Sequence, residues 1–289
     1  MNVFARIIIL FTAVLFYNCV GQYPLIIEKD ELKNDIINAK HVIFIGIDGF
    51  GSAYIQNANI PTIKKMINGG TFYTNTYNLL PSNSYINWPS LFRGTEFKKQ
   101  IGDNFPSIFT IIKNKYSNNN VSFFYKWDEL KKINPNGFIE EFINGSDLDS
   151  AEKFSVYIKE NKPVFSAVVF DDLDAAGHKK GWGSKSYYKK LEEIDNYISM
   201  IIQASIDSGI FNETVFVLSA DHGGFGLSHN LDVIKNRKIP LIFYGQGVKK
   251  GYISYKSVSI CEIAPTIAFI LGTEAPPEWT GYPLTDLFE

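Results

Sequence analysis

Residues 215–224 read VFVLSADHGG, a short apolar run that ends in a carboxylate, an imidazole and two glycines. The run shows no polar alternation, which is typical of a strand covered on both faces of a parallel sheet. Residues 42–49, VIFIGIDG, and residues 164–172, VFSAVVFDD, repeat the pattern of an apolar run followed by aspartate. These three stretches predict buried strands that deliver carboxylates to one edge of a sheet.

Helical patterns alternate with the apolar runs along the chain. Strands are expected at Val42–Ile47, Val121–Tyr125, Val164–Phe170, Val215–Ser219 and Ile239–Tyr244. Helices are expected at Thr62–Asn68, Ser107–Lys115, Asp147–Glu160, Ser184–Ser205 and Ile260–Leu271. This alternation predicts an α/β fold, with a mostly parallel central sheet and helices on both of its faces.

The composition is that of an ordinary globular protein. Of the 289 residues, 45% are hydrophobic and 20% are charged, which argues against a disordered chain or a multi-span membrane protein. There are 28 Lys and Arg against 30 Asp and Glu, so no basic excess indicates a nucleic-acid duplex as partner. Two cysteines exclude a disulfide framework and a thiolate zinc cluster.

The first 21 residues are expected to be a secretory signal peptide, which leaves a single catalytic domain over residues 22–289. One positive charge precedes the apolar residues 7–17, and Gly21 is a small residue suited to cleavage. The run is shorter than the roughly 20 residues of a membrane span, so no stable span is expected after cleavage. An uncleaved signal anchor is the alternative. Sequons begin at Asn120, Asn144 and Asn212, so a secreted protein of a glycosylating eukaryote would be a glycoprotein.

Carboxylates and histidines gather directly after the predicted strands. In an open parallel sheet, ligands bind beyond the carboxyl ends of the strands. Like charges gathered there are costly unless cations neutralise them. Carboxylate oxygen and imidazole nitrogen are ligands of zinc and similar divalent ions. Six such groups would form two sites of three ligands each: Asp48, Asp174, His178, Asp221, His222 and His229.

Spacing alone leaves an alternative open, in which these are turn aspartates and loop histidines that never meet. The fourth histidine, His41, stands apart at the start of the first predicted strand, and we expect it to be structural or on the surface.

A segment rich in hydroxyl and amide side chains holds the candidate nucleophile. Residues 80–92 read LPSNSYINWPSLF, and Pro89 suits the first turn of a helix that begins near Asn87. Unpaired N–H groups at a helix start favour an anion such as phosphate, which makes Ser84 the candidate. A serine needs a base or a metal to lower its pKa. With three histidines expected as ligands, metal activation is favoured over a Ser-His-Asp triad. The alternative is that Ser82 and Asn87 merely cap the helix.

Four motifs taken together resemble the alkaline phosphatase superfamily, and within it the type I phosphodiesterase/nucleotide pyrophosphatase family. In order, they are GIDG at 46–49, PSNSYINW at 81–88, DAAGH at 174–178 and SADHGG at 219–224. The D-x-x-G-H and D-H-G elements are specific when they occur together in this order. The resemblance extends from about Val42 to about Pro283.

The resemblance implies an alkaline-phosphatase-like three-layer α/β/α sandwich with two divalent metal ions, zinc in that family, at the carboxyl edge of the sheet. The implied ligands are Asp174, His178 and His229 for one ion, and Asp48, Asp221 and His222 for the other. Ser84 would be the nucleophile, bridging toward the metals. Asn87 would donate a hydrogen bond to a phosphoryl oxygen.

The implied function is metal-dependent hydrolysis of phosphodiester or pyrophosphate bonds in a small phosphoric ester, through a phosphoseryl intermediate. The chain departs from the family in having Ile86 where a proline is common, and in placing His229 close behind the D-H-G motif. A sulfatase would have x-Pro-x-Arg after its nucleophile, and residues 84–88 lack both. Arg93 is the candidate for the arginine that would favour a monoester. The alternatives are therefore a phosphomonoesterase with the same centre and a secreted binding protein without turnover.

Four aromatic residues near these motifs bear on the leaving group. They are Tyr85, Trp88, Trp127 and Trp182. Such side chains can stack a nucleobase, pack against a lipid head group or lie in the core. The sequence does not choose between these roles, and it gives no oligomeric state.

Overall fold

The computed structural model describes residues 37, 39–100, 105–116, 121–133, 139–142 and 145–289. All of these belong to one compact unit. The predicted signal peptide at 1–21, the domain start at residue 22 and the sequons at Asn120 and Asn144 lie outside the described residues. No helix in the described part of the chain is long and apolar enough to cross a membrane.

Eight strands of the described chain form a single sheet, in the order β4-β3-β5-β1-β6-β7-β2-β8. The strands are β1 (His41–Ile47), β2 (Thr71–Tyr77), β3 (Val121–Tyr125), β4 (Ile139–Phe142), β5 (Phe165–Phe170), β6 (Thr214–Ser219), β7 (Lys238–Gly245) and β8 (Tyr252–Ser259). β7 runs antiparallel to both of its neighbours, and all other pairs are parallel. The sheet is therefore mostly parallel, as predicted.

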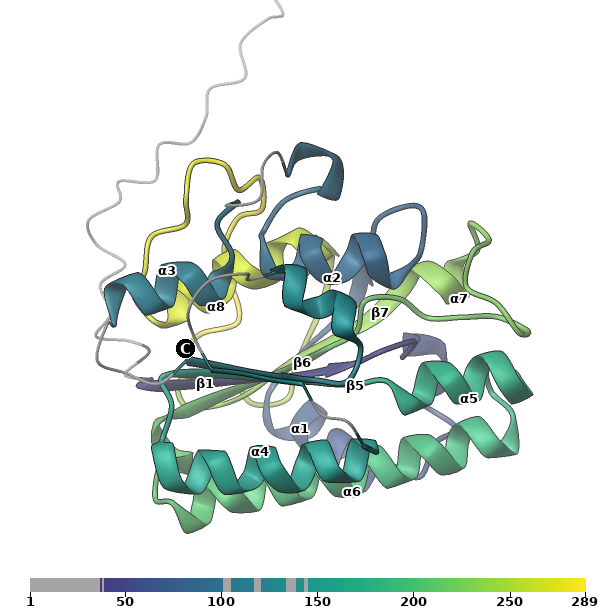
Figure 1. Ribbon diagram of the computed structural model, residues 1–289, viewed down its shortest axis with the longest axis horizontal. Coiled ribbons are helices and arrows are strands. Elements are labelled where there is room, and N and C mark those ends of the chain that lie inside the picture. Colours follow the sequence, from purple (N-terminus) through teal and green to yellow (C-terminus); the bar gives the residue numbers. More distant parts are fainter. Residues whose placement is uncertain (1–36, 38, 101–104, 117–120, 134–138, 143–144) are drawn as a thin grey trace, which may run out of the picture. The chain divides into compact units, whose positions relative to one another are not determined.

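Helices cover both faces of this sheet (Figure 1). They are α1 (Pro61–Gly69), α2 (Ser84–Phe92), α3 (Ile108–Lys115), α4 (Asp147–Asn161), α5 (Asp172–Lys180), α6 (Lys185–Asp207), α7 (Ile234–Arg237) and α8 (Ile263–Ile270). α1, α4, α5 and α6 lie on one face, where α6 contacts the other three, and α2, α3 and α8 pack together on the opposite face. The predicted three-layer α/β/α arrangement is confirmed.

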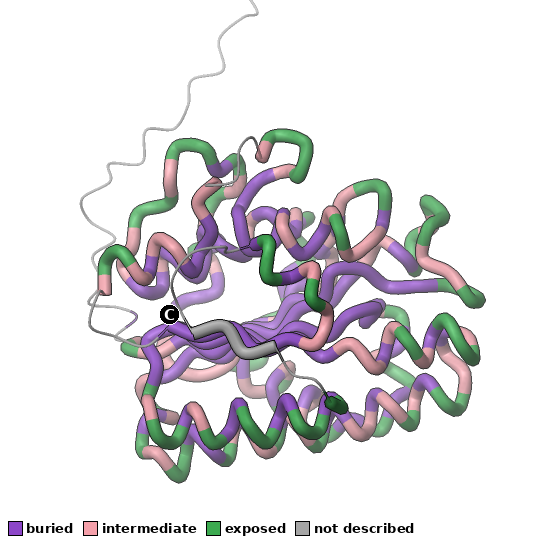
Figure 2. Tube along the Cα trace, in the orientation of Figure 1, coloured by how far each residue is buried: buried purple, intermediate pink, exposed green. Residues whose placement is uncertain are grey.

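The three central strands explain why the site lies where it does. Every residue of β5 and β6 is buried, as are all but the first of β1, so the sheet forms the buried middle layer seen in Figure 2. In β1, Gly46 pairs with Val169 of β5 on one side and Ser219 of β6 on the other. Because the three strands are parallel and in register, their carboxyl ends meet at one edge.

The start of the helix after the nucleophile segment was predicted wrongly. α2 begins at Ser84 rather than near Asn87, and Pro89 lies inside the helix. The cap is Asn83, whose side chain accepts a hydrogen bond from the Ile86 N–H at 3.1 Å. Asparagine is a strong N-cap residue, and its effect outweighs the preference of proline for the first turn. The correction places Ser84 in the first turn of α2.

Candidate active site

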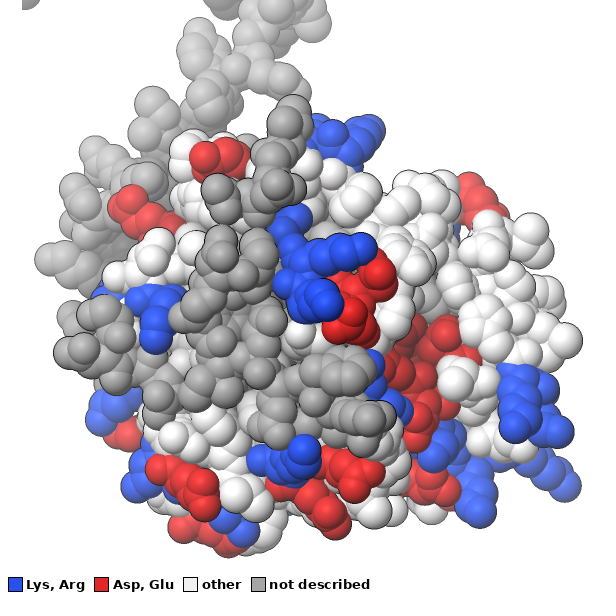
Figure 3. Space-filling model, viewed as in Figure 1, with Lys and Arg blue, Asp and Glu red and all other residues white. Residues whose placement is uncertain are grey.

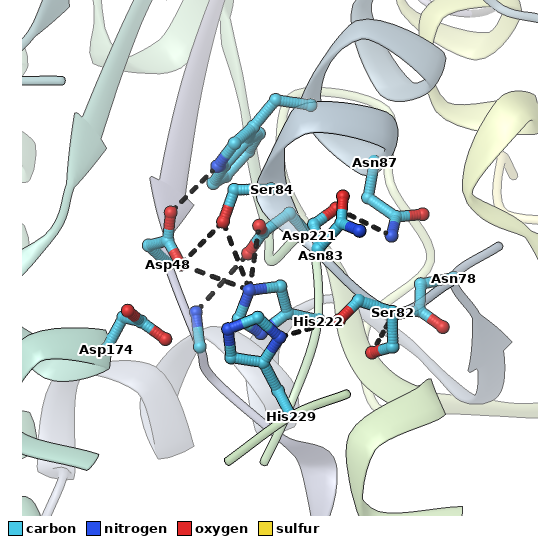
Figure 4. A network of polar contacts seen from close by, with 12 residues as sticks. Asp48, Asn78, Ser82, Asn83, Ser84, Asn87, Asp174, Asp221, His222 and His229 are labelled. Atoms are coloured by element: carbon cyan, nitrogen blue, oxygen red, sulfur yellow. Dashed lines mark hydrogen bonds and ion pairs between the residues drawn. The ribbon is translucent and has the colours of Figure 1, made fainter. Parts of the chain in front are cut away.

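The carboxyl edge of the sheet brings together all six candidate ligands. Figure 4 shows all of them except His178. Asp48 follows β1, Asp221 and His222 follow β6, and α5 begins directly after β5. They form two groups, Asp174 with His178 and His229, and Asp48 with Asp221 and His222. Within each group the ligand atoms lie within 4.8 Å of one another. The alternative in which these residues never meet is therefore excluded.

The Asp48, Asp221 and His222 group is buried, whereas in the other group Asp174 and His229 are partly buried and His178 is exposed. Asp221 and His222 are fully buried, and Asp48 is 5% exposed. One carboxylate oxygen of Asp174 and one of Asp221 are buried without a hydrogen-bond partner. Burial and the nearby Asp48 charge raise the pKa of Asp174 to about 8 and that of Asp221 well above its usual range. Gathering carboxylates in this way is costly without a counter-charge, so the donor set fits divalent cations.

The histidine rings are oriented by one shared feature, a backbone carbonyl facing Nδ1. The pairs are His178 with Leu227 at 3.0 Å, His222 with Gly223 at 2.8 Å and His229 with Ser82 at 2.6 Å. If Nδ1 donates in each ring, Nε2 carries the lone pair that a metal binds. Burial, followed by the neighbouring His222, lowers the pKa of His229 to about 4, which keeps that ring neutral. His41 lies apart at the start of β1, with Nδ1 facing the carbonyl of Pro163.

Trp182 explains the glycines of two motifs. Its ring packs edge-on to His178 and His229, with centroids 5.0 and 6.0 Å apart, and its Nε1 donates to the Gly49 carbonyl at 2.9 Å. A Cβ on Gly177 would lie 2.5 Å from this indole, and one on Gly224 would lie 2.1 Å from it. The glycines therefore make room for a buried tryptophan that supports the ligand histidines.

Ser84 lies beside the group of Asp48, Asp221 and His222. Its Oγ is 3.1 Å from Nε2 of His222 and donates to Asp48 at 3.4 Å. A Ser-His-Asp triad would place a carboxylate at Nδ1 of the histidine, where His222 has the carbonyl of Gly223 instead. The geometry favours a serine that is activated by a metal. Ser82, the competing hydroxyl, is fully buried and bonded elsewhere.

Asn87 differs from what the sequence analysis expected. It is fully buried, and its carboxamide is bonded to the chain at both ends. Its Oδ1 accepts from the Leu79 N–H at 2.8 Å, and its Nδ2 donates to the carbonyls of Asn83 and Leu79 at 3.0 and 3.2 Å. In Figure 4 it lies beyond Asn83, away from Asp48 and Asp174. This geometry leaves no free donor for a phosphoryl oxygen, and it makes Asn87 a residue of α2 that supports the loop before Ser84.

Arg93 is also unavailable to a substrate. Its guanidinium donates to Gln100 at 3.1 Å and to the carbonyls of Lys132 and Ile133 at 2.7 and 3.2 Å. Burial lowers its pKa. The expectation that Arg93 could clamp a phosphate therefore gives way to a structural role, in which it ties the end of α2 to the segment before β4.

The four aromatic residues divide into two kinds. Trp88 and Trp182 are buried, and Trp88 donates from Nε1 to Asp48 at 3.0 Å, a supporting role that the sequence analysis missed. Tyr85 is 59% exposed and packs edge-on to Trp127, with ring centroids 4.7 Å apart. The Tyr85–Trp127 pair therefore forms an aromatic surface next to the nucleophile.

A buried ion pair that the sequence did not reveal supports α5. The carboxylate of Asp147 is buried and accepts from the backbone N–H groups of Asp171 and Asp172 at 3.1 and 2.9 Å. Lys126 donates to the same carboxylate at 2.9 Å. Asp147 thus satisfies N–H groups where α5 begins, the helix that carries Asp174. No local pattern distinguishes Asp147 from other acidic residues at helix starts.

Fold and site together define a member of the alkaline phosphatase superfamily. Within it, the chain belongs to the type I phosphodiesterase/nucleotide pyrophosphatase family, whose model matches residues 42–99 and 94–241. All six candidate ligands and Ser84 lie within the matched residues.

Similar proteins carry out several chemistries. A phosphopentomutase of Alkaliphilus metalliredigens is 30% identical over 143 residues, which cover 49% of this chain and 35% of the mutase. A bis(5'-adenosyl)-triphosphatase of Bos taurus is 20% identical over 213 residues, covering 63% of this chain and 47% of that protein. The chain thus spans less than half the length of these relatives. The murine ectonucleotide pyrophosphatase/phosphodiesterase 5 shares the fold, with a TM-score of 0.73 at 12% identity over 86% of this chain and all of that one.

Proposed function

We propose that this protein hydrolyses phosphodiester or pyrophosphate bonds of small molecules, with Ser84 as nucleophile and two divalent ions, zinc by preference, as cofactors. The observation that supports this best is the position of the Ser84 hydroxyl, within 3.4 Å of both Asp48 and His222. Family membership supports a phosphoryl-transfer hydrolase, and the substrate class is our inference.

The ligand set suits two ions of the same kind. Asp174, His178 and His229 would hold one, and Asp48, Asp221 and His222 the other. Mixed carboxylate and imidazole ligands in threes leave an open position, as in catalytic zinc sites. When bound, such ions lower the pKa of a hydroxyl and neutralise charge on phosphoryl oxygens.

The reaction follows from the placement of Ser84. Its Oγ attacks phosphorus while the bond to the leaving oxygen breaks, and the leaving group departs with that electron pair. The first turn of α2, where Ser84 lies, favours a phosphoryl anion because its N–H groups and dipole face the same way. The leaving oxygen takes up, by way of solvent, the proton that Ser84 loses on attack. Water then attacks phosphorus as the bond to Oγ breaks, and Oγ regains a proton from that water. Where Nδ1 of His178, His222 and His229 donates to its backbone carbonyl, Nε2 of the same ring is the atom that would hold the ion.

The arginines favour a monoanionic diester over a dianionic monoester. Arg93 is engaged by the chain, and Arg237 lies 3.4 Å from Asp232. Both described arginines therefore have partners within the chain. A phosphomonoesterase of this superfamily would use an arginine to balance the additional charge, which makes the monoesterase alternative weaker.

The Tyr85–Trp127 pair supports a planar group such as a nucleobase on the substrate, because aromatic faces stack on planar rings. An inactive variant of the murine phosphodiesterase is known in complex with AMP. On the face shown in Figure 3, lysines and arginines are interspersed with acidic side chains and form no broad basic surface. A small nucleotide-like ester is therefore a better fit than a nucleic-acid duplex.

Comparing two chromogenic substrates tests this proposal. We expect a higher kcat/KM for a nitrophenyl ester of a nucleotide than for nitrophenyl phosphate, and loss of both activities on chelation. Preference for the monoester would support the phosphomonoesterase alternative. No release of nitrophenol by the zinc-loaded protein would favour the binding-protein alternative. Secretion through residues 1–21 remains part of the proposal, and N-terminal sequencing of the exported protein tests it.

A further inference from the structure

The six residues before the nucleophile, Asn78–Asn83, form a loop that serves both ligand groups; we call it the nucleophile loop. Its end leads directly into Ser84, which lies beside Asp48 and His222. Its Ser82 carbonyl faces Nδ1 of His229 at 2.6 Å, and His229 belongs to the other group. One short segment therefore places the nucleophile at one ligand group and orients a ligand of the other.

In the described part of the chain, the hydrogen-bond partner of the His229 ring is the Ser82 carbonyl of this loop. His229 lies in an irregular segment between β6 and α7, and its neighbours Leu227 and Leu231 are 61% and 60% exposed. Besides the Ser82 carbonyl and Asp174 of its own ligand group, His229 contacts rings. It stacks on His222 with centroids 3.9 Å apart and meets His178 and Trp182 edge-on at 5.0 and 6.0 Å. Ring stacking alone leaves the ring free to slide, so the carbonyl fixes the direction of Nε2.

Buried side chains hold the nucleophile loop from two sides. From α2, Asn87 bonds to the backbone of Leu79 and Asn83, near the two ends of the loop. From within the loop, Ser82 Oγ donates to the Asn236 carbonyl at 3.1 Å and accepts from Asn78 Nδ2 at 2.8 Å. Asn78, Ser82 and Asn87 are at most 2% exposed, so water does not replace these bonds.

The same contacts reach the residue after His222. The Asn236 carbonyl accepts a hydrogen bond from Ser82 Oγ and another from the Gly223 N–H at 2.8 Å. The nucleophile loop and the segment that carries both His222 and His229 therefore share an anchor. Moving Ser82 would shift the acceptor of His229 and loosen this anchor.

We propose that Asn78, Ser82 and Asn87 are positioning residues that set the metal affinity of the group formed by Asp174, His178 and His229. They act through the Ser82 carbonyl on His229 and touch neither the metal nor the substrate. The inference rests on the metal centre of the proposed function. Partners of metal-bound histidines usually contribute about 10- to 100-fold to metal affinity.

Zinc affinity tests this without reference to turnover. The full chain is freed of metal and titrated with zinc against a chromophoric chelator, as wild type and as Ser82→Ala, Asn87→Ala and Ser90→Ala. Ser90 is the matched control, because it is a fully buried serine that bonds only within α2, to the Ile86 carbonyl at 2.7 Å. We expect Ser82→Ala and Asn87→Ala to weaken one zinc site about tenfold, and Ser90→Ala to weaken neither.

A double substitution identifies the affected site. His229→Ala should weaken the same site, and adding Ser82→Ala to it should cause little further loss, because the carbonyl then has no ring to orient. Additive losses, equal weakening of both sites, or the same loss in Ser90→Ala would overturn the inference. Should Ser82→Ala not fold, Asn78→Ser carries the same expectation. If the wild type binds no zinc, the proposed metal centre itself is overturned. If the wild type binds zinc and the variants bind it with the same affinity, only this inference is overturned.

Discussion

Freed of metal, the protein should lose stability as the pH rises from 6.5 to 8. Burial and the Asp48 charge raise the pKa of Asp174 from 3.8 to about 8. Burial lowers the pKa of His229 from 6.5 to about 4. Between pH 4 and 6.5 the folded protein holds one proton more than the unfolded chain at Asp174 and one fewer at His229, so the two effects cancel. Above pH 6.5, of these two residues only Asp174 still differs in protonation between the folded and unfolded states.

The sign and size follow from proton linkage. The folded state binds the additional proton, so the free energy of unfolding falls with rising pH by about 1.4 kcal/mol per unit. Over the window from 6.5 to 8, Asp174 contributes about 2 kcal/mol to this loss. Asp171 and Asp221, whose pKa values burial raises well above the usual range, contribute with the same sign.

Urea unfolding of chelator-treated protein at several pH values between 6.5 and 8 measures this loss. Asp174→Asn should show a shallower decline, because asparagine holds no titrating proton. Asp149→Asn is the control, since hydrogen bonds from Ser146 lower the pKa of Asp149 and it stays ionised throughout. Zinc-saturated protein should show no decline, because bound zinc displaces the proton. A flat or rising free energy in the metal-free protein, or an Asp174→Asn slope as steep as that of wild type, would refute the reasoning.

Three substitutions test the support around the site. Asp147→Ala removes the carboxylate that binds both Lys126 and the start of α5. Urea titrations should show that it lowers the free energy of unfolding by about 3 kcal/mol, and a loss below about 1 kcal/mol would contradict this role of Asp147. Gly177→Ala places a methyl group against Trp182, and it should lower the free energy of unfolding by about 1 to 3 kcal/mol and weaken zinc binding. Unchanged zinc binding would contradict the role of Trp182 in supporting the ligand histidines. Tyr85→Ala should raise KM about fivefold for a nucleotide ester and leave that of a methyl ester unchanged, and equal effects on both would contradict stacking.

The sequence predicts the elements whose burial is complete and misses those whose burial is partial. β1, β5 and β6 are mostly apolar and almost completely buried, and they were predicted to within one residue at each end. β2 reads TFYTNTY, with polar residues throughout, and β8 is largely exposed at the sheet edge, so neither carries the signal of a buried strand. The antiparallel direction of β7 was also missed, because an apolar run does not encode strand direction.

At the site, the residue types were predictable and most of their supports were not. Asp174 and His178 stand four residues apart, a helical spacing that indicates α5 and that the sequence analysis left unused. The carboxamide of Asn87 and the carboxylate of Asp147 find their partners only through the folded arrangement of the loop before α2 and of the start of α5. Because these partners are not visible in the sequence, Asn87 was interpreted as a residue that binds the substrate, and nothing distinguished Asp147 from the other acidic residues.

The stereochemical course at phosphorus tests whether Ser84 forms a covalent intermediate. A diester that is chiral at phosphorus, with its configuration set by sulfur and an oxygen isotope, is turned over by the zinc-loaded protein in the presence of an acceptor alcohol. Two successive in-line displacements, first by Ser84 Oγ and then by the alcohol, predict net retention, and Ser84→Ala should abolish the transfer while both zinc ions still bind. Inversion at phosphorus in the wild type, or a near-normal rate in Ser84→Ala, would contradict the account.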